Sequence, residues 1–266
     1  MLKNRIVIKV GSSILVENQK INLHRMEALA KLIFDLKEKY EVILVSSGAV
    51  AAGYTRLSLD KSDLTNKQVL ASIGQPLLME LYAELFKKYN IITSQILLTA
   101  YDFDSRKHTQ NARNAMEVLL KNGVLPIVNE NDVIATGELK YLGFGDNDQL
   151  SAYVTHYFKA SLLVILSDID GYYDDNPHTN QQAKMYKIIH SIAKEELEAN
   201  ATPHNQFATG GIVTKLKAAN FLLENNKKMF LTSGYQLEFV REFLLQGIES
   251  GVWEKGTLFV PCKLDK

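Results

Sequence analysis

The sequence predicts an α/β protein, a three-layer αβα sandwich with a mostly parallel, open central sheet. Two observations lead to this prediction. Short, continuously apolar runs alternate with longer segments of helical periodicity, and this alternation is typical of parallel strands that helices cover on both faces. No internal repeat and no change of composition divides the 266 residues. We therefore expect a single domain over residues 1–266, with one lobe up to about residue 160 and a second lobe from about 161 to 266.

Seven apolar segments are predicted to be strands of this sheet, because a strand buried on both faces is apolar along its whole length. These segments are Arg5–Val10, Glu41–Ser46, Ile91–Thr99, Val124–Asn129, Ser161–Ser167, Lys228–Thr232 and Thr257–Val260. The polar stretch Asp168–Gln182 contains Gly, Pro and Asn and is predicted to be a loop. Val133–Phe144 carries glycines and mixed polarity, which predicts a hairpin or flap.

Helical periodicity occupies the stretches between the predicted strands. Asn22–Tyr40 has apolar residues at i, i+3, i+4 and i+7 spacing, and Asn22 is well placed as its N-cap. Asp63–Tyr89 is interrupted by Gly74 and Pro76, which predicts either two helices or one kinked helix. Further helices are expected from Gly48 onward and over Thr109–Asn122, Asp146–Lys159, Gly210–Asn226 and Leu237–Gln246.

The composition excludes several classes of function. Lys+Arg and Asp+Glu both number 30, so the chain lacks the basic excess of a nucleic-acid binder. No apolar run approaches the ~18 residues of a transmembrane helix, so no membrane partner is expected. Cys262 is the single cysteine and cannot form an internal disulfide, which together with the absence of a signal peptide favours the cytoplasm. The six histidines lack metal-ligand spacing, so no protein-bound metal site is expected.

Five junctions that lead into predicted helices or loops are rich in Gly, Ser, Asn, Asp or Lys. They are Lys9–Ser13, Ser46–Ala49, Asn129–Asp132, Gly145–Asp148 and Thr209–Lys215. Ligands of open α/β sheets bind beyond the carboxyl ends of the strands. We therefore expect these five segments to gather at one edge of the sheet and to form the functional site there.

Two of the junctions suit the binding of phosphate. Lys9 ends a strand and is followed by Gly11 and two serines, which offers a cation, a closely approaching backbone and small donors. A surface lysine beside a tight turn is the alternative that the local sequence leaves open. At the last junction Gly210 and Gly211 open a helix with Lys215 in its first turns. A helix dipole disfavours a cation there unless an anion is close, and a phosphate would supply that anion.

The other three junctions suit a small substrate with a carboxylate and an ammonium group. Small residues at Ser46–Ala49 leave backbone N–H groups for an anion, although an ordinary helix cap would have the same sequence. The oxygens of Asn129–Asp132 can accept hydrogen bonds from an ammonium group, and an Asx turn is the alternative. Gly145–Asp148 holds two Asp and one Asn, which is more than helix capping needs.

Together these segments resemble the amino acid kinase family from Ile6 to about Phe259. The segments that carry the resemblance are VIKVGSS (7–13), VSSGAVAAG (45–53), KQVLASIGQ (67–75), QNARNAMEVLL (110–120), PIVNENDVIAT (126–136), GDNDQLSA (145–152), LSDIDGYYDDNP (166–177) and ATGGIVTKLKAA (208–219). The NEND, GDND and ASIGQ segments are similar to the branch that phosphorylates the γ-carboxylate of L-glutamate with ATP. That reaction gives L-glutamyl 5-phosphate, in the first step of proline biosynthesis.

The resemblance implies a role for each matching residue. Lys9 and Lys215 would contact the transferred phosphate as catalytic residues, with Asp148 orienting them. The residues implied to bind the amino acid are Ser47, Gly48, Asn129, Asp132 and Asn147. The residues implied to bind the nucleotide are Lys9, Gly11, Ser167, Asp168, Thr209, Gly210, Gly211 and Lys215.

The resemblance also implies cofactors and partners. ATP and Mg²⁺ are expected, with the first lobe binding the amino acid and the second binding ATP. A homo-oligomer, dimer or tetramer, and feedback inhibition by proline are implied as well. Many family members carry an extra C-terminal domain similar to RNA-modifying enzymes, and none is expected in this chain.

Three other functions remain as alternatives at this point. The chain could be a sister kinase that acts on acetylglutamate, aspartate or uridylate, or an amino-acid sensor without catalysis that keeps the fold. The sensor hypothesis would be favoured by loss of either lysine, and both lysines are present. A nicotinamide-dependent oxidoreductase would share the αβα pattern, but the sequence lacks the GxGxxG fingerprint of such enzymes.

Overall fold

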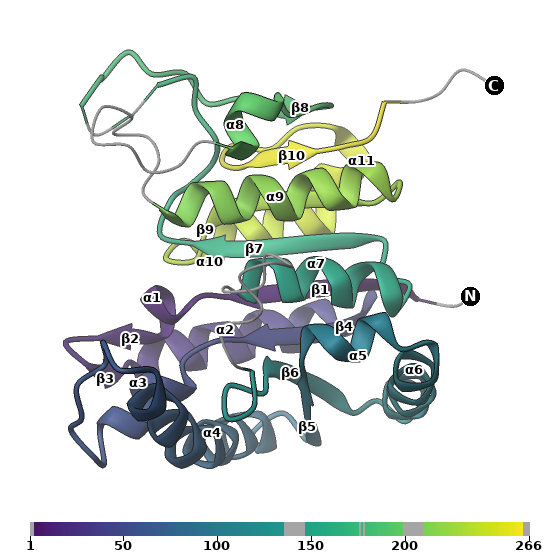
Figure 1. Cartoon of the computed structure of the whole chain (residues 1–266). Coiled ribbons are helices and arrows are strands. Elements are labelled where there is room, and N and C mark those ends of the chain that lie inside the picture. Colours follow the sequence, from purple (N-terminus) through teal and green to yellow (C-terminus); the bar gives the residue numbers. More distant parts are fainter. Residues whose placement is uncertain (1–2, 136–146, 176, 178, 199–209, 263–266) are drawn as a thin grey trace.

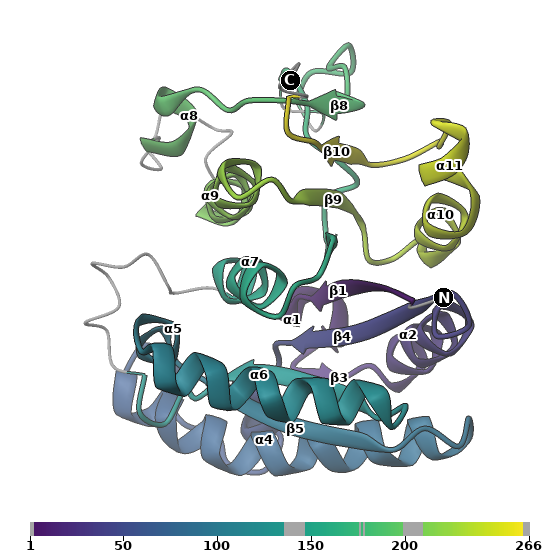
Figure 2. The ribbon, with the colours of Figure 1, turned by 90° about the vertical axis from the view of Figure 1, so that its right-hand side faces the viewer.

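The computed structural model describes residues 3–135, 147–175, 177, 179–198 and 210–262. An eight-stranded sheet runs through the molecule in the order β5-β6-β4-β1-β7-β9-β10-β8, with helices on both of its faces (Figures 1 and 2). Its strands are β1 (Asn4–Val10), β4 (Tyr40–Ser46), β5 (Thr93–Leu98), β6 (Leu125–Glu130), β7 (Leu162–Ser167), β8 (Ile188–Ile189), β9 (Lys228–Ser233) and β10 (Thr257–Phe259). Every neighbouring pair is parallel except β9 and β10. The predicted fold class is confirmed, with a short hairpin of β2 (Val16–Glu17) and β3 (Lys20–Ile21) beside the sheet.

The helices include every one that the sequence predicted and several short ones that it did not. They are α1 (Ser12–Leu15), α2 (Leu23–Leu36), α3 (Ala49–Tyr54), α4 (Leu64–Lys87), α5 (Ala100–Asp104), α6 (Arg106–Lys121), α7 (Asn147–Tyr157), α8 (Lys194–Glu198), α9 (Gly210–Glu224), α10 (Leu237–Glu242), a π-helical turn (Phe243–Gly247) and α11 (Ile248–Ser250). None of the helices in the described part of the chain is long and apolar enough to cross a membrane.

The sheet separates two hydrophobic cores, because successive side chains of a strand point to opposite faces. Ile6 and Ile8 of β1 pack with α2, α4 and α10 on one face. Val7 packs with α5, α6, α7 and α9 on the other face, and the two layers are seen on either side of the sheet in Figure 2. Lys9 follows Val7 by two residues, so its side chain lies on the face that α7 and α9 cover.

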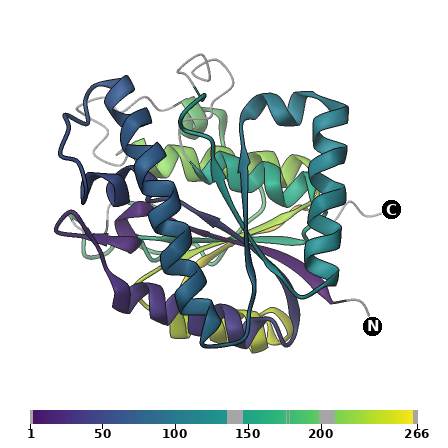
Figure 3. The same cartoon turned by 90° about the horizontal axis from the view of Figure 1, so that it is seen from below.

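Helix α4 differs from its prediction. It runs without a break through Gly74 and Pro76, so the two-helix alternative is wrong. Gly74 is a site of close packing rather than an interruption: a Cβ there would lie 1.8 Å from the backbone oxygen of Ala49 in α3. Gly53 of α3 approaches α4 in the same way, since its Cβ would lie 1.9 Å from the oxygen of Leu70. Figure 3 views the molecule from below and shows α4 in front of the sheet.

Two further boundaries bear on the predictions. Asn22 caps α2 as expected, and its side chain accepts a hydrogen bond from the N–H of Arg25. The helix ends at Leu36 and not at the predicted Tyr40, because Tyr40 starts β4 and its hydroxyl donates to the oxygen of Leu244 at 2.6 Å. The predicted flap at Val133–Phe144 lies outside the described residues from position 136 onward.

Candidate active site

The register of the sheet brings the ends of its central strands to one edge. Val10 at the end of β1 pairs with Ser46 of β4 and with Leu166 of β7, and Leu166 pairs with Thr232 of β9. The chain that follows each strand therefore leaves the sheet at the same level, and Ser47 N–H donates to the oxygen of Val10 at 3.2 Å. The expectation that the polar junctions gather at one edge is confirmed for the two junctions that follow β1 and β4.

A buried carboxylate at this edge joins two lysines from different elements. Asp148, in the first turn of α7, has Oδ1 2.5 Å from Nζ of Lys9 in β1. Its other oxygen, Oδ2, lies 3.1 Å from Nζ of Lys215 in α9. Asp148 is fully buried, while Lys9 is 4% and Lys215 7% exposed. The fold thus holds two cations close together around a single anion.

Further hydrogen bonds fix this lysine–aspartate group to α9. The hydroxyl of Thr214 donates to Oδ2 of Asp148 at 3.0 Å, and Nζ of Lys215 donates to the oxygen of Gly211 at 2.9 Å. Gln149, the next residue of α7, donates from Nε2 to the oxygen of Thr214 at 3.0 Å. Burial acts to raise the pKa of Asp148, but the charges of Lys9 and Lys215 outweigh it and lower that pKa below its ordinary value.

A pocket of about 350 Å³ opens beside the lysine–aspartate group. It is lined by Ser12, Ser47, Gly48, Ala49, Val50, Ala51, Lys61, Asn129, Glu130, Asp132 and Asn147. All five residues predicted to bind the amino acid are in this set. Asn147 belongs to the pocket while Asp148, the next residue, belongs to the lysine–aspartate group, so the first turn of α7 connects the two sites.

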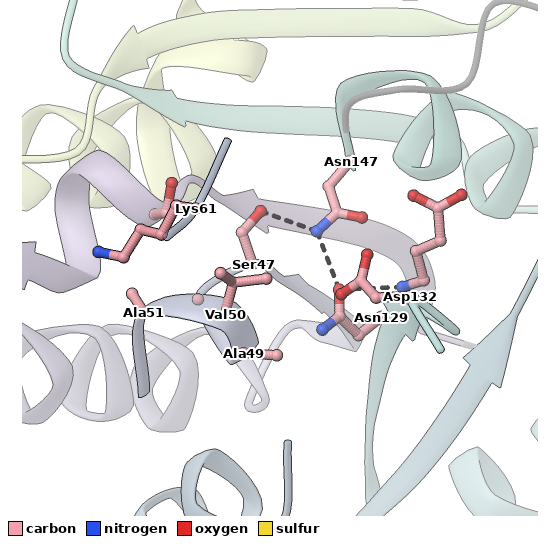
Figure 4. Close-up of a pocket in the computed structure, with 11 residues that line it drawn as sticks. Ser47, Ala49, Val50, Ala51, Lys61, Asn129, Asp132 and Asn147 are labelled. Atoms are coloured by element: carbon pink, nitrogen blue, oxygen red, sulfur yellow. Dashed lines mark hydrogen bonds between the residues drawn. The ribbon is translucent and has the colours of Figure 1, made fainter. Parts of the chain in front are cut away.

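An amide network forms the centre of the pocket (Figure 4). Nδ2 of Asn147 donates to Oγ of Ser47 at 2.8 Å and to Oδ1 of Asn129 at 2.9 Å. Oδ1 of Asn129 also accepts the backbone N–H of Glu130 at 2.9 Å. Oδ1 of Asn147 is buried and has no hydrogen-bond partner among the described residues. The pocket therefore contains an acceptor that a donor on a ligand could satisfy.

Two other residues define the chemistry of the pocket. Asp132 is partly buried, and this burial raises the pKa of its carboxyl group above the ordinary value. A cationic ligand close to Asp132 would stabilise the ionised carboxylate. Gly48, the N-cap of α3, has φ of 110°, a left-handed conformation that glycine adopts without strain.

The residues predicted to bind the nucleotide lie around the same edge. Ser167 ends β7, and its hydroxyl donates to Oδ1 of the exposed Asp168 at 2.9 Å. A Cβ on Gly11 would lie 3.6 Å from Nζ of Lys9, and one on Gly211 would lie 3.9 Å from Nζ of Lys215. Gly210 opens α9 beside them. Thr209 lies outside the described residues.

Sequence reasoning assigned no role to two polar residues at the site, Lys61 and Gln75. Lys61 lines the pocket from the loop before α4, with its Nζ 3.5 Å from the ring centroid of Tyr54. In Figure 4 its ammonium group points away from Asn147. Gln75 in α4 bonds directly to Asn129. The sequence did not indicate a functional role for Lys61, because this residue belongs to no motif at the end of a strand. Gln75 lay in a segment that carried the resemblance, but no role was assigned to it.

Comparisons with known proteins show which family the chain resembles over its length. The sequence pattern of the amino acid kinase family matches residues 4–233. "Glutamate 5-kinase" of Leishmania donovani is 60% identical over 255 residues, which is 96% of this chain and 94% of that protein. "Glutamate 5-kinase" of Wolinella succinogenes is 58% identical, with 96% of this chain and 97% of that protein covered.

Solved structures show the same fold at low sequence identity. UMP kinase from Ureaplasma parvum superposes with a TM-score of 0.66 at 17% identity, covering 98% of this chain and 100% of that chain. Carbamate kinase from Giardia lamblia has a TM-score of 0.64 at 14% identity, covering 97% of this chain and 99% of that chain. With the family pattern matched over most of its length, the chain belongs to the amino acid kinase family.

Proposed function

We propose that the protein transfers the γ-phosphoryl group of ATP to the γ-carboxylate of L-glutamate, giving L-glutamyl 5-phosphate and ADP. This is the reaction of a glutamate 5-kinase and the first step of proline biosynthesis. One observation carries the proposal. Consecutive residues of α7 join an amino-acid pocket, through Asn147, to a pair of lysines, through Asp148. The relatives with 58–60% identity over nearly the whole chain carry the name of this activity.

The pocket has groups for both charged ends of an amino acid. Asp132 and the unpartnered Oδ1 of Asn147 would accept hydrogen bonds from the ammonium group, with Asn129 close by. The hydroxyl of Ser47 and the N–H of Gly48 would donate to the α-carboxylate. Bound in this way, the substrate would extend its side chain toward Lys9 and Lys215.

The chemistry needs no general base. A glutamate side chain has an ordinary pKa of about 4.3 and is already ionised at neutral pH. One of its oxygens attacks the γ-phosphorus, a new O–P bond forms, and the bond from that phosphorus to the β–γ bridging oxygen breaks. The obstacle is repulsion between anions and alignment of the transfer. Lys9 and Lys215 would offset the charge of the moving phosphoryl group, and Asp148 would hold both lysines in place.

The nucleotide would lie along Gly11, Ser167, Asp168 and the start of α9, where Gly210 and Gly211 open the helix and its first N–H groups can bind phosphate, with Thr209 as a further candidate. The residues that the structure describes contain no cluster of three or more His, Cys, Asp or Glu side chains that could hold a metal. Mg²⁺ is usually bound through one or two carboxylates and the substrate phosphates, so the phosphate oxygens of ATP would supply most of its ligands other than water, and the ion would neutralise part of their charge.

Several further expectations accompany this proposal. Residues up to about 160 would supply the amino-acid site and later residues the ATP site, in a homo-oligomer of two or four chains. Proline would act as a feedback inhibitor, since it shares the ammonium group and α-carboxylate that the pocket suits. A cytoplasmic location is in keeping with the single, exposed Cys262.

The test is ADP release from Mg-ATP with L-glutamate, L-aspartate, N-acetylglutamate or UMP supplied separately. Hydroxylamine is included to trap an acyl phosphate as a hydroxamate. Turnover that depends on L-glutamate and yields a hydroxamate is expected. Turnover with another acceptor alone would assign the chain to a sister kinase, and turnover with none would favour an amino-acid sensor.

A further inference from the structure

The ASIGQ segment of helix α4 lies beside the pocket without lining it. Gly74 lets α4 approach α3 so closely that a Cβ would lie 1.8 Å from the oxygen of Ala49, and Ala49 itself lines the pocket. This contact fixes the next residue, Gln75, against the end of β6. Gln75 is 8% exposed, and its Oε1 accepts a hydrogen bond from Nδ2 of Asn129 at 2.8 Å.

The orientation of the Asn129 amide follows from its neighbours. The backbone N–H of Glu130 can only donate, so the atom of Asn129 that faces it at 2.9 Å must be the oxygen Oδ1. Nδ2 of Asn129 then points the other way, toward α4, and requires an acceptor because the residue is only 2% exposed. Oε1 of Gln75 is that acceptor.

The orientation of the Asn129 amide determines the orientation of the Asn147 amide. Since Oδ1 of Asn129 must accept, the group of Asn147 that contacts it is Nδ2, which also donates to Oγ of Ser47. Both N–H bonds of this amide are then used. Its oxygen is left without a partner among the described residues and can accept from a ligand. The Ser47 oxygen accepts from Asn147, so the Ser47 hydroxyl proton is available to a carboxylate.

We propose that Gln75 is a positioning residue for the amino-acid site. It holds the Asn129 amide in the orientation that presents Oδ1 of Asn147 to the substrate ammonium group and the Ser47 hydroxyl to the α-carboxylate. The inference rests on the proposed function, because it names how the same pocket recognises an α-amino acid. Gln75 touches no substrate itself and acts through Asn129.

The test compares recognition of the ammonium group between variants. Glutarate has the two carboxylates of L-glutamate and lacks the ammonium group. The measured quantities are the KM for L-glutamate and the inhibition constant of glutarate as its competitor. Gln75→Met removes the acceptor at similar length and volume, and Gln75→Glu keeps an acceptor. Gln95→Met is the matched control, because Gln95 is exposed on the edge strand β5.

Gln75→Met should weaken the preference for L-glutamate over glutarate by about 10- to 100-fold, the scale of one hydrogen bond to a charged group. The KM for ATP should change little. Gln75→Glu and Gln95→Met should keep the preference. A loss of stability alone would lower the amount of active protein and leave this ratio unchanged, so the ratio separates positioning from folding.

A double-mutant cycle supplies the second measurement. If Gln75 acts through Asn129, then Gln75→Met should add little to the effect of Asn129→Ala on the preference. Additive effects would overturn the inference, and so would an unchanged preference in Gln75→Met or an equal loss in Gln75→Glu. A wild-type chain without glutamate-dependent ADP release would instead overturn the proposed function on which the inference rests.

Discussion

Asp148→Asn is the substitution that most directly tests the lysine–aspartate group. It keeps the shape of the side chain and removes its charge. Lys9 and Lys215 would then be two buried ammonium groups whose shared carboxylate is gone. Nδ2 of the new amide could not accept from either lysine. We therefore expect a loss of stability in the free protein and a loss of transfer, because neither lysine is held toward the phosphate.

The magnitude follows from the burial of the group. Asp148 is 0% exposed and lies 2.5 Å from one ammonium nitrogen and 3.1 Å from the other, so solvent screens these contacts little. Removing one partner of a buried ion pair costs about 3–5 kcal/mol of unfolding free energy. For a chain of this size, 1 kcal/mol corresponds to roughly 2–4 °C in Tm. Asp148→Asn should therefore lower Tm by roughly 6–20 °C.

Asp35 provides a matched control on the surface. Its carboxylate also joins two cations, Lys31 at 2.5 Å and Arg241 at 3.2 Å, but both of these side chains are 57% exposed. Exposed ion pairs contribute about 0–1 kcal/mol, so Asp35→Asn should change Tm by no more than a few degrees. The two variants share the substitution, have closely similar ion-pair distances and differ in burial.

Thermal unfolding and urea titration at pH 7 measure the difference. Adding Mg-ATP should raise Tm more in Asp148→Asn than in wild type, because phosphate anions replace the missing charge. The pKa of Asp148 is lowered in the folded state. Its contribution to the free energy of unfolding is therefore complete above the unfolded pKa of about 3.9 and is lost as the pH falls through the folded pKa. The difference in Tm between the variant and wild type should accordingly become smaller in acid. A Tm within 2 °C of wild type at pH 7 would refute the reasoning, as would a deficit independent of pH.

Three other outcomes are expected. Lys215→Ala should lower kcat by a factor of about 10²–10³, the scale of losing one group that stabilises the transferring charge, and an unchanged kcat in a turnover assay would remove that role. Asp132→Ala should mainly raise the KM for L-glutamate. Because burial raises the pKa of Asp132, the KM of the wild-type protein should rise as the pH falls toward that pKa. The KM of the variant should lack this dependence on pH. Gly74→Ala places a Cβ 1.8 Å from a backbone oxygen of α3 and should cost at least about 1–3 kcal/mol in urea titration; Gly123→Ala, where a Cβ would meet nothing within 4 Å, should show only the smaller cost of its positive φ.

The strands could be predicted because burial on both faces leaves a continuous apolar run in the sequence. The seven predicted segments all form strands of the sheet. Ile188–Ile189 and Lys194–Glu198 were missed since two and five residues are too few to show a period. Gly74 was misjudged for a different reason. A glycine that ends a helix and a glycine that lets two helices touch look alike in the sequence.

The residues of the candidate site could be predicted where their type and position in the sequence were informative. Polar residues at the ends of apolar strands identified Lys9 and Asn129, and a glycine pair at a helix start identified Lys215. Hydrogen-bond partners could not be predicted in the same way. Gln75 lies in the interior of a helix, where glutamine is an ordinary helix former. Its hydrogen bond to Asn129 therefore could not be inferred from the neighbouring sequence. Lys61 belongs to a loop whose path only the fold determines.

In the proposed mechanism, the arrangement on α7 would separate the choice of substrate from the chemistry of transfer. Successive side chains of a helix point about 100° apart, since a turn takes 3.6 residues. Asn147 therefore faces the pocket while Asp148 faces the lysines. With the proposed roles, a change at Asn147 would alter how an amino acid is held and leave the lysines paired, so transfer to a different acid would remain chemically open. A change at Asp148 would remove the charge that positions both lysines, and the loss would then apply to every acceptor that the pocket admits.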